Sequence, residues 1–184
     1  AEYKNLLPPE RKWARKHLFI ARKAFHITQK VQEICYRISK DSVLKGPDSS
    51  GQLDAFRHAL WMALLAKQFG EKRAIQIGKV HEESNRLIFE QLLTEDGVMP
   101  DSAGREMDLI NNLIGASLGA RNRYASDEAL CKLMIHQIKE GGFYILRTNE
   151  AGYFLNCQGE VINMSVYLNQ WNIPKCLVPS NQVH

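Results

Sequence analysis

The sequence predicts a mainly α-helical, single-domain bundle with a small C-terminal β-hairpin. Three observations support this prediction. Through most of the first 141 residues, apolar side chains recur at intervals of three and four, which is the period of an amphipathic helix. After Gly141-Gly142 the pattern changes to short runs rich in aromatic and β-branched residues, which are typical of strands. The length of 184 residues suits one domain, residues 1–184, with a substantial core.

Residues 1–45 are predicted to form a basic helical region. Pro8-Pro9 followed by Glu10 is a good helix opening, because proline fits the first turn and an acid lies near the positive end of the helix dipole. One long helix, or two with a bend near His26 to Thr28, fits the apolar spacing that follows. Residues 1–40 carry ten Lys/Arg against three Asp/Glu. This excess suits an anionic partner such as a membrane surface or nucleic acid, although a solvated helix face more often has this composition.

Residues 51–141 are predicted to form the helical core. After a loop at residues 45–51, turn signals divide the core into four helices, over residues 52–69, 71–94, 102–122 and 126–141. Gly70 is expected to cap the first of them. Gly115 and Gly119 lie inside the third helix, where glycine costs about 1 kcal/mol relative to alanine. The pair therefore indicates a close approach by another backbone or by a ligand.

Residues 142–165 are predicted to form the β-hairpin, and residues 166–184 an irregular tail. The runs FYIL and YFLNC flank the polar turn RTNEAG, and Glu160 to Ile162 can continue the sheet. Four cysteines are present without CxxC spacing, at positions 35, 131, 157 and 176. They fit two disulfides in an exported protein or four free thiols in a cytosolic one, and these alternatives stay open. The first residue is Ala1 rather than Met, as expected for a processed or truncated chain.

The helix predicted over residues 52–69 carries charged side chains where a buried helix should be apolar. Asp54, Arg57, His58 and Trp61 share one face, because they lie at i, i+3, i+4 and i+7. Apolar residues cover most of its remaining surface. Burying an unpaired ion costs several kcal/mol, so we expect other helices to supply partners.

The next two predicted helices also carry a polar face. Polar side chains again share one face, namely His81, Glu82 and Asn85 on the second helix and Asp108, Asn111 and Asn112 on the third. If the three faces converge, carboxylates and histidines become neighbours that shift one another's pKa values towards neutrality, which suits general acid/base chemistry. The competing explanation is structural, because Asp–Arg pairs within a helix are common and Asn and His often satisfy backbone groups.

We assign expected roles to these residues. The candidate catalytic groups, with Glu82 or Asp108 as the base that activates water, are His58, His81, Glu82 and Asp108. The same four are the candidate ligands if the unknown cofactor is a divalent metal ion. The candidate substrate-binding residues are Asp54, Arg57, Trp61, Asn85, Asn111 and Asn112. Arg57 suits a phosphate or carboxylate, which its planar guanidinium can bind with two hydrogen bonds. The sequence contains no HExxH, Walker A or GxGxxG motif.

Three ordered segments, DAFRHALW (54–61), GKVHEESN (78–85) and MDLINNLIG (107–115), resemble an uncharacterised bacterial domain family found in secreted, surface and toxin-like proteins. The family pattern is D-A-x-R-H-x-x-W, then G-x-x-H-E, then M-D-x-x-N-N-x-x-G, and the resemblance extends from about Ala24 to Ile145. Leu60 and Ile110 stand where many members have Tyr and His, which weakens any metal site that needs a histidine at 110. Residue by residue, the resemblance marks Asp54, Arg57, His58, Trp61, His81, Glu82, Asp108, Asn111, Asn112 and Gly115.

This resemblance implies export and a hydrolytic effector, but no particular reaction. We therefore expect a hydrolase of the cell envelope or a secreted toxin-like hydrolase, acting on a phosphoester or lipid-linked substrate, with a cognate inhibitor if it is a toxin. A non-enzymatic binding or structural module with a buried polar network is the first alternative. A nuclease-type toxin is the second, and it would need nucleic-acid binding that weakens steeply with salt. No apolar run approaches the roughly 20 residues of a membrane-spanning helix, so we expect a soluble chain.

Overall fold

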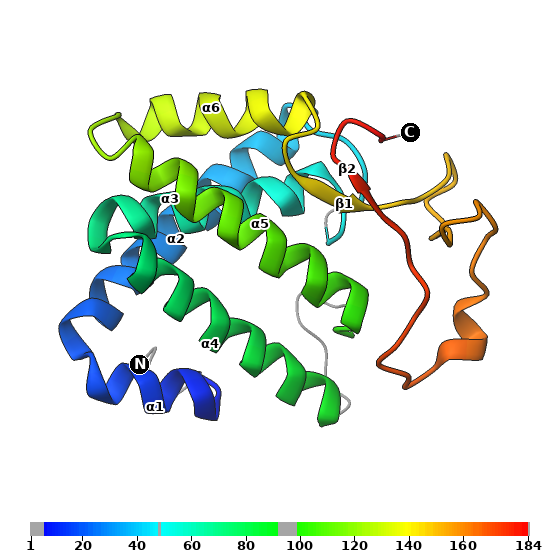
Figure 1. The fold of residues 1–184 in the computed structure, drawn as a ribbon, viewed down its shortest axis with the longest axis horizontal. Coiled ribbons are helices and arrows are strands. Elements are labelled where there is room, and N and C mark those ends of the chain that lie inside the picture. The colour runs from blue at the N-terminus through cyan, green and yellow to red at the C-terminus, as the bar shows by residue number, and fades with distance from the viewer. Residues whose placement is uncertain (1–5, 48, 92–98, 184) are drawn as a thin grey trace.

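The computed structural model describes residues 6–47, 49–91 and 99–183. The end of the helix expected over residues 71–94 and the Asp96-Gly97 pair, which is a turn signal in the sequence, lie outside these ranges. In chain order the elements are α1 (Pro8–Lys16), α2 (Leu18–Lys40), α3 (Gln52–Phe69), α4 (Glu71–Glu90), α5 (Ser102–Arg121), α6 (Asp127–Lys139), β1 (Tyr144–Leu146), the 3-10 helix η2 (Met164–Tyr167) and β2 (Leu177–Pro179). The prediction of a mainly helical bundle with a small C-terminal antiparallel sheet is confirmed (Figure 1).

Helix α3 lies at the centre of the bundle, where it packs against α2, α4, α5 and α6 (Figure 1). Twelve of its 18 residues are buried, so it has almost no solvated side. This burial follows from an apolar surface that extends nearly all the way round the helix. As predicted, α3 ends at Gly70, whose positive φ of 85° suits a residue without a Cβ. The polar side chains of α3 are therefore carried into the interior of the protein.

The closest helix pair is α3 with α5, and two glycines make it possible. A Cβ atom on Gly115 would lie 2.5 Å from the carbonyl oxygen of Ala59, and one on Gly119 would collide with the backbone of Ala63. Glycine on α5 and alanine on α3 thus let the two backbones touch. The predicted close approach is confirmed, and its partner is the backbone of α3. This contact fixes how the polar residues of the two helices face each other.

The first two helices meet at His17 rather than near His26 to Thr28, where a bend was one of the two expected arrangements. His17 has non-helical dihedrals, φ −137° and ψ 46°. The break allows α1 to pack on α4 while α2 packs on α3. The apolar spacing continues through position 17, so it carries no signal for this turn. None of the helices in the described ranges combines the length and apolarity that a membrane crossing requires.

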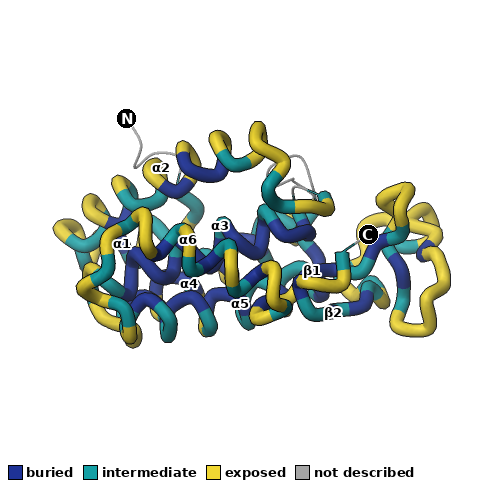
Figure 2. The backbone as a smooth tube through the Cα atoms, turned by 90° about the horizontal axis from the view of Figure 1, so that it is seen from above, coloured by how far each residue is buried: buried dark blue, intermediate teal, exposed yellow. Residues whose placement is uncertain are grey.

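The sheet pairs β1 with β2, with Ile145 opposite Val178. The run YFLNC was expected to pair with FYIL, but it instead forms isolated bridges at Thr148–Phe154 and Leu155–Val161. The segment expected as an irregular tail supplies β2, because long-range anchors hold it beside β1. Among them, the side-chain amide of Gln52 donates to the carbonyl oxygen of Ser180 at 2.8 Å. Between the two strands, a mostly exposed excursion extends from the helical body (Figure 2).

One disulfide joins Cys157 to Cys176, with their Cα atoms 4.9 Å apart. Cys35 and Cys131 are free thiols. The arrangement lies between the two alternatives that the sequence left open. The disulfide ties the excursion to the residue that precedes β2, and burial raises the pKa of the Cys35 thiol to about 12.

Candidate functional site

Helix α3 brings Asp54 and His58 into the interior one turn apart. Their side chains are only 3% and 2% exposed. Arg57, on the same turn, is 31% exposed and contacts an Asp54 carboxylate oxygen at 2.5 Å. Since a buried carboxylate requires a cationic or hydrogen-bonding partner, this ion pair accounts for part of the stability of Asp54 at this position. The guanidinium reaches from the buried carboxylate towards solvent.

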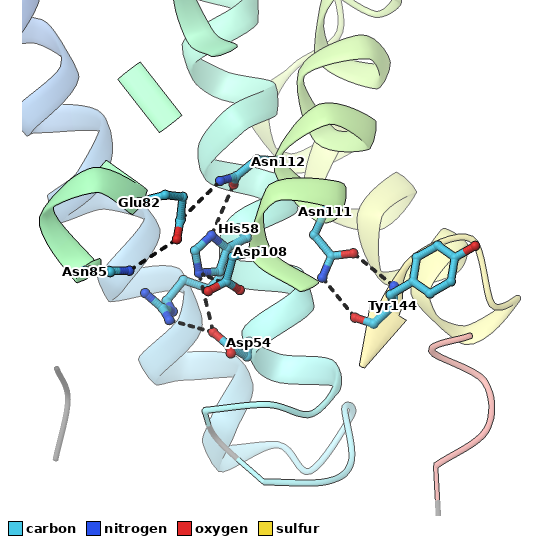
Figure 3. A network of polar contacts seen from close by, with 9 residues as sticks. Asp54, His58, Glu82, Asn85, Asp108, Asn111, Asn112 and Tyr144 are labelled. Carbon is cyan, nitrogen blue, oxygen red and sulfur yellow. Dashed lines mark hydrogen bonds and ion pairs between the residues drawn. The ribbon is translucent and has the colours of Figure 1, made fainter. Parts of the chain in front are cut away.

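Helix α5 supplies the groups opposite His58, as Figure 3 shows. The Nδ1 atom of His58 lies 3.1 Å from the side-chain oxygen of Asn112. Its Nε2 atom lies 3.2 Å from Oδ1 of Asp108 and 3.7 Å from Oδ1 of Asp54. Asp108 and Asn112 are four residues apart and so share one face of α5. The imidazole ring is thus held between an amide at one nitrogen and two carboxylates at the other.

Helix α4 closes the network through Glu82, which has no exposed surface. The side-chain amides of Asn85 and Asn112 donate to its two carboxylate oxygens at 3.4 and 3.5 Å. Because the Asn112 nitrogen points to a carboxylate, its oxygen must be the atom that faces His58 (Figure 3). That oxygen can only accept, so His58 Nδ1 carries the proton. In the neutral imidazole, Nε2 then presents a lone pair to the two aspartates.

The surroundings of His58 favour its neutral form. Burial lowers the pKa of His58 well below its usual value, and electrostatic interactions with Arg57 and His81 act in the same direction. The hydrogen bond with Asn112 opposes this shift and is the weaker influence. Near neutral pH, Nε2 is therefore available as a base or as a ligand.

Asp54 and Asp108 line a pocket of about 70 Å³. A buried water needs only about 10–15 Å³ measured in this way, so the pocket holds a few waters or a small ion with waters. Its described lining includes four carboxylates (Asp54, Glu82, Asp101 and Asp108) and three cationic side chains (Arg57, Arg105 and Lys175). With His58 neutral, the formal charge of these groups is −1.

Three charged pocket residues, Asp101, Arg105 and Lys175, were not predicted as site residues from the sequence. Asp101 caps α5 through hydrogen bonds to the backbone of Ala103 and Gly104, and its other oxygen contacts Lys175 at 2.6 Å. Both side chains of this ion pair are buried, at 5% and 4% exposure. Asp101 has the position of a helix cap just before residues 102–122, and Lys175 lies 74 residues away in the tail, where no local pattern marks it.

Several predicted site residues lie together, whereas others do not. Asp54, Arg57, Glu82, Asn85 and Asp108 line the pocket, and His58 and Asn112 adjoin it through Asp108 and Glu82.

Three predicted residues have partners elsewhere. Asn111 exchanges two hydrogen bonds of 2.9 Å with the backbone of Tyr144 and so ties α5 to β1. His81 contacts Glu10 at 3.2 Å. The indole nitrogen of Trp61 donates to the hydroxyl of Thr28 at 3.0 Å.

The groups best placed for a metal ion differ from the four expected ligands. Among the described residues, single ligand atoms of Asp54, His58 and Asp108 lie within 4.8 Å of one another. His58 and Asp108 were expected in this role, and Asp54 joins them. Within the described part of the chain, neither His81 nor Glu82 belongs to this group. Glu82 instead accepts hydrogen bonds from the two asparagine amides.

The candidate site lies within the part of the chain that matches a family model. Residues 11–142, which span α1 to α6, match a single family model. All three helices of the polar network lie inside that match. No curated protein and no solved structure matches the chain. Because the match covers most of its length, the chain belongs to the family described as Domain of unknown function (DUF6973).

Proposed function

We propose that this chain is a hydrolase whose reaction centre is His58 with Asp54 and Asp108. The observation that carries the proposal is the unprotonated Nε2 atom of His58, which faces two carboxylates beside a pocket. A lone pair and two carboxylates meeting at one point can bind a water and polarise it for attack. None of these three groups donates a hydrogen to the other two, which is unusual for contacts that serve only stability.

Arg57 provides the substrate side of the proposed reaction. It is partly exposed, lines the pocket and is held by Asp54. A guanidinium in this position can bind a phosphate or carboxylate of the substrate next to the activated water. We therefore propose a phosphoester as the substrate class. We also propose that the carboxylate closest to the reacting water is that of Asp108 rather than that of Glu82.

The test is hydrolysis of 4-nitrophenyl esters of phosphate monoester, phosphate diester and carboxylate type. We expect a phosphate ester, and not the carboxylate ester, to be hydrolysed, and His58→Ala to lower kcat by about 100-fold or more, the range of acid/base groups. Glu128→Gln is the matched control, because it removes an exposed carboxylate of α6 that is paired with Lys132. Wild-type rates in both His58→Ala and Asp108→Asn would refute the proposal.

A structural module is the second candidate, and one specific observation favours it. The chain of contacts from Glu82 through Asn112 to His58 joins α3, α4 and α5 inside the bundle. If this network exists for stability, His58→Ala and Asp108→Asn should both lower the melting temperature. Active-site groups tend to do the opposite, because they are retained at a cost in stability.

We also propose that the protein acts at an anionic membrane surface. Residues 11–32 contain seven Lys/Arg and no Asp/Glu. Where α1 meets α2, Leu18 is 63% exposed and Phe19 90% exposed. Exposed apolar side chains among basic ones are the pattern of an interfacial helix, in which the apolar groups enter the lipid and the cations contact the headgroups.

An exported, bacterial setting accords with this proposal. The Cys157–Cys176 disulfide supports it, because such bonds persist mainly outside the reducing cytosol. A secreted toxin held by a cognate inhibitor fits the same setting. Nucleic acid is the competing partner of the basic stretch, and its binding would fall steeply with salt and would not depend on Phe19.

A further inference from the structure

We infer that Asp54, His58 and Asp108 bind one divalent metal ion, of the class of Mn²⁺ or Zn²⁺. The three residues come from two helices, α3 and α5, whose backbones are in contact. This inference deepens the proposed function by naming its cofactor, but it stands on the geometry of the site alone.

The first argument is the direction of the lone pairs. Asn112 fixes the proton of His58 on Nδ1, so Nε2 and the oxygens of Asp54 and Asp108 all present electron pairs to one another. Nε2 lies 3.2 and 3.7 Å from these two oxygens, and of the three acceptor atoms Asp54 Oδ1 also contacts the cationic Arg57, which shows that this cluster can hold positive charge. A metal ion satisfies all three at once.

The second argument is distance. Metal–ligand bonds of about 2.0–2.2 Å place neighbouring ligand atoms roughly 3.0–3.6 Å apart. The separations from Nε2 to the two carboxylate oxygens, 3.2 and 3.7 Å, are close to this range. All three atoms lie within 4.8 Å of one another, so small rotations of the carboxylates complete the set.

The third argument is the support around the ligands. Metal-binding histidines usually donate their second ring nitrogen to an oxygen, and His58 does so to Asn112, which is held by Glu82. The Asp54 carboxylate is likewise held by Arg57. Neighbouring groups thus orient two of the three ligands in the same manner as the outer shell of known metal sites.

The fourth argument is the pocket beside the ligands. It includes two residues, Ser50 and Asn85, each with a buried side-chain oxygen that has no hydrogen-bond partner among the described residues. Buried polar atoms are almost always satisfied, so these oxygens indicate bound water or ligand.

The ligand set and the charge select the type of ion. One imidazole nitrogen with two carboxylates suits Zn²⁺ or Mn²⁺ better than Mg²⁺ or Ca²⁺, which prefer oxygen alone. The ion would change the formal charge of the pocket from −1 to +1 and so favour an anionic substrate beside Arg57. A bound divalent ion also lowers the pKa of its water, which supplies the nucleophile that the proposed reaction needs.

The experiment is titration of the metal-stripped, full chain with MnCl₂ and, separately, ZnCl₂, followed by calorimetry and by melting curves. We expect one ion per chain and a melting temperature that rises by roughly 5–10 °C at 100 times the Kd. Asp108→Asn should abolish this rise. Asn112→Ala should weaken binding by about 10–100-fold, as loss of an outer-shell partner does. Glu128→Gln should bind as the wild type does.

A second measurement on the wild-type chain makes the test independent of whether a variant folds. Bound Mn²⁺ should broaden the NMR signals of the His58 ring beyond detection at substoichiometric amounts, while those of His136 on α6 persist. Absence of binding, equal affinity in folded Asp108→Asn, or broadening at His136 alone would overturn the inference. Binding without hydrolysis would refute the proposed function only, and hydrolysis that is unaffected by chelator would refute the metal site only.

Discussion

Two clusters of charge in this protein use the same side-chain types to opposite effect. On the surface, the carboxylate of Asp127 on α6 forms ion pairs with Lys30 at 2.5 Å and with Lys67 at 2.6 Å. In the interior, the unprotonated Nε2 atom of His58 faces the carboxylates of Asp54 and Asp108. The outer cluster matches one carboxylate with two cations, whereas the inner one brings three acceptor atoms together, of which Asp54 Oδ1 also contacts Arg57. This difference is the reason why we propose a ligand site in the interior and a structural ion pair on the surface.

The largest expected effect is a loss of activity when Asp108 of the interior cluster is changed. We expect Asp108→Asn to lower kcat by about 100-fold or more, which corresponds to roughly 2.7 kcal/mol of transition-state stabilisation. The same change should leave the metal-free protein as stable or slightly more stable, because an asparagine amide can donate to His58 Nε2. Kinetics and chemical denaturation of the same sample check both parts. A loss of stability with unchanged kinetics would favour the structural module.

The next effect concerns Asn112, which joins the ring to Glu82. Asn112→Ala should lower the free energy of unfolding by about 1–3 kcal/mol, because a buried carboxylate loses one of its donors. Urea denaturation measures this loss. Asn122→Ala, just after α5, is the control, since it removes an asparagine that donates to the helix's own backbone at Leu118. Equal losses in the two variants would show that the network adds nothing beyond an ordinary helix contact.

A smaller effect tests the basic surface. Phe19→Ser should weaken binding to vesicles that contain phosphatidylglycerol by about tenfold, because one aromatic side chain no longer enters the lipid. Tyr124→Ser, which removes another exposed aromatic residue, should bind as the wild type does. Sedimentation with vesicles measures both. If neutral vesicles bind equally well, or if single-stranded DNA competes fully, the proposed partner is wrong.

The smallest expected effect is the pH dependence of the stability that Asp127 of the outer cluster contributes. Hydrogen bonds from Lys30 and Lys67 lower the pKa of Asp127 from its usual value of 3.8. A lowered folded-state pKa stabilises the protein above the unfolded pKa, and this stabilisation is lost as the pH falls through the folded value. Asp127→Asn should therefore cost less than about 1 kcal/mol at pH 7 and nothing well below pH 3.8, since the carboxylate is partly exposed. Melting curves between pH 7 and pH 3 check this sign.

The helices and the polar face of α3 were predictable from the sequence because both depend on local periodicity. Asp54, His58 and Asp108 stand out in the sequence itself, since charged residues on an apolar helix are conspicuous. The roles within the set were less predictable. Asp54 was expected to bind substrate, yet the structure places it among the atoms that could ligate a metal. Periodicity tells which face a residue occupies but not which neighbour its side chain will meet.

The sheet was harder to predict because its partners are far apart in the chain. β1 pairs with a strand more than 30 residues later, and the disulfide that holds the intervening excursion joins cysteines 19 positions apart. A hairpin with a nearby run is the default from local pattern, and part of it survives as the Thr148–Phe154 bridge. Lys175 was missed for the same reason, since its buried partner Asp101 lies on a different element.

The glycine contact between α3 and α5 sets the dimensions of the proposed reaction centre with uncharged atoms. Ala59 follows His58 directly, and Gly115 comes three residues after Asn112, so the two backbones touch within one turn of the imidazole. A single methyl group at position 115 would force the backbones of α3 and α5 apart and so move Asp108 away from His58. The spacing of the proposed metal ligands is therefore controlled by a residue that is not one of them. Substitutions at Gly115 would tune ion selectivity without altering any coordinating atom.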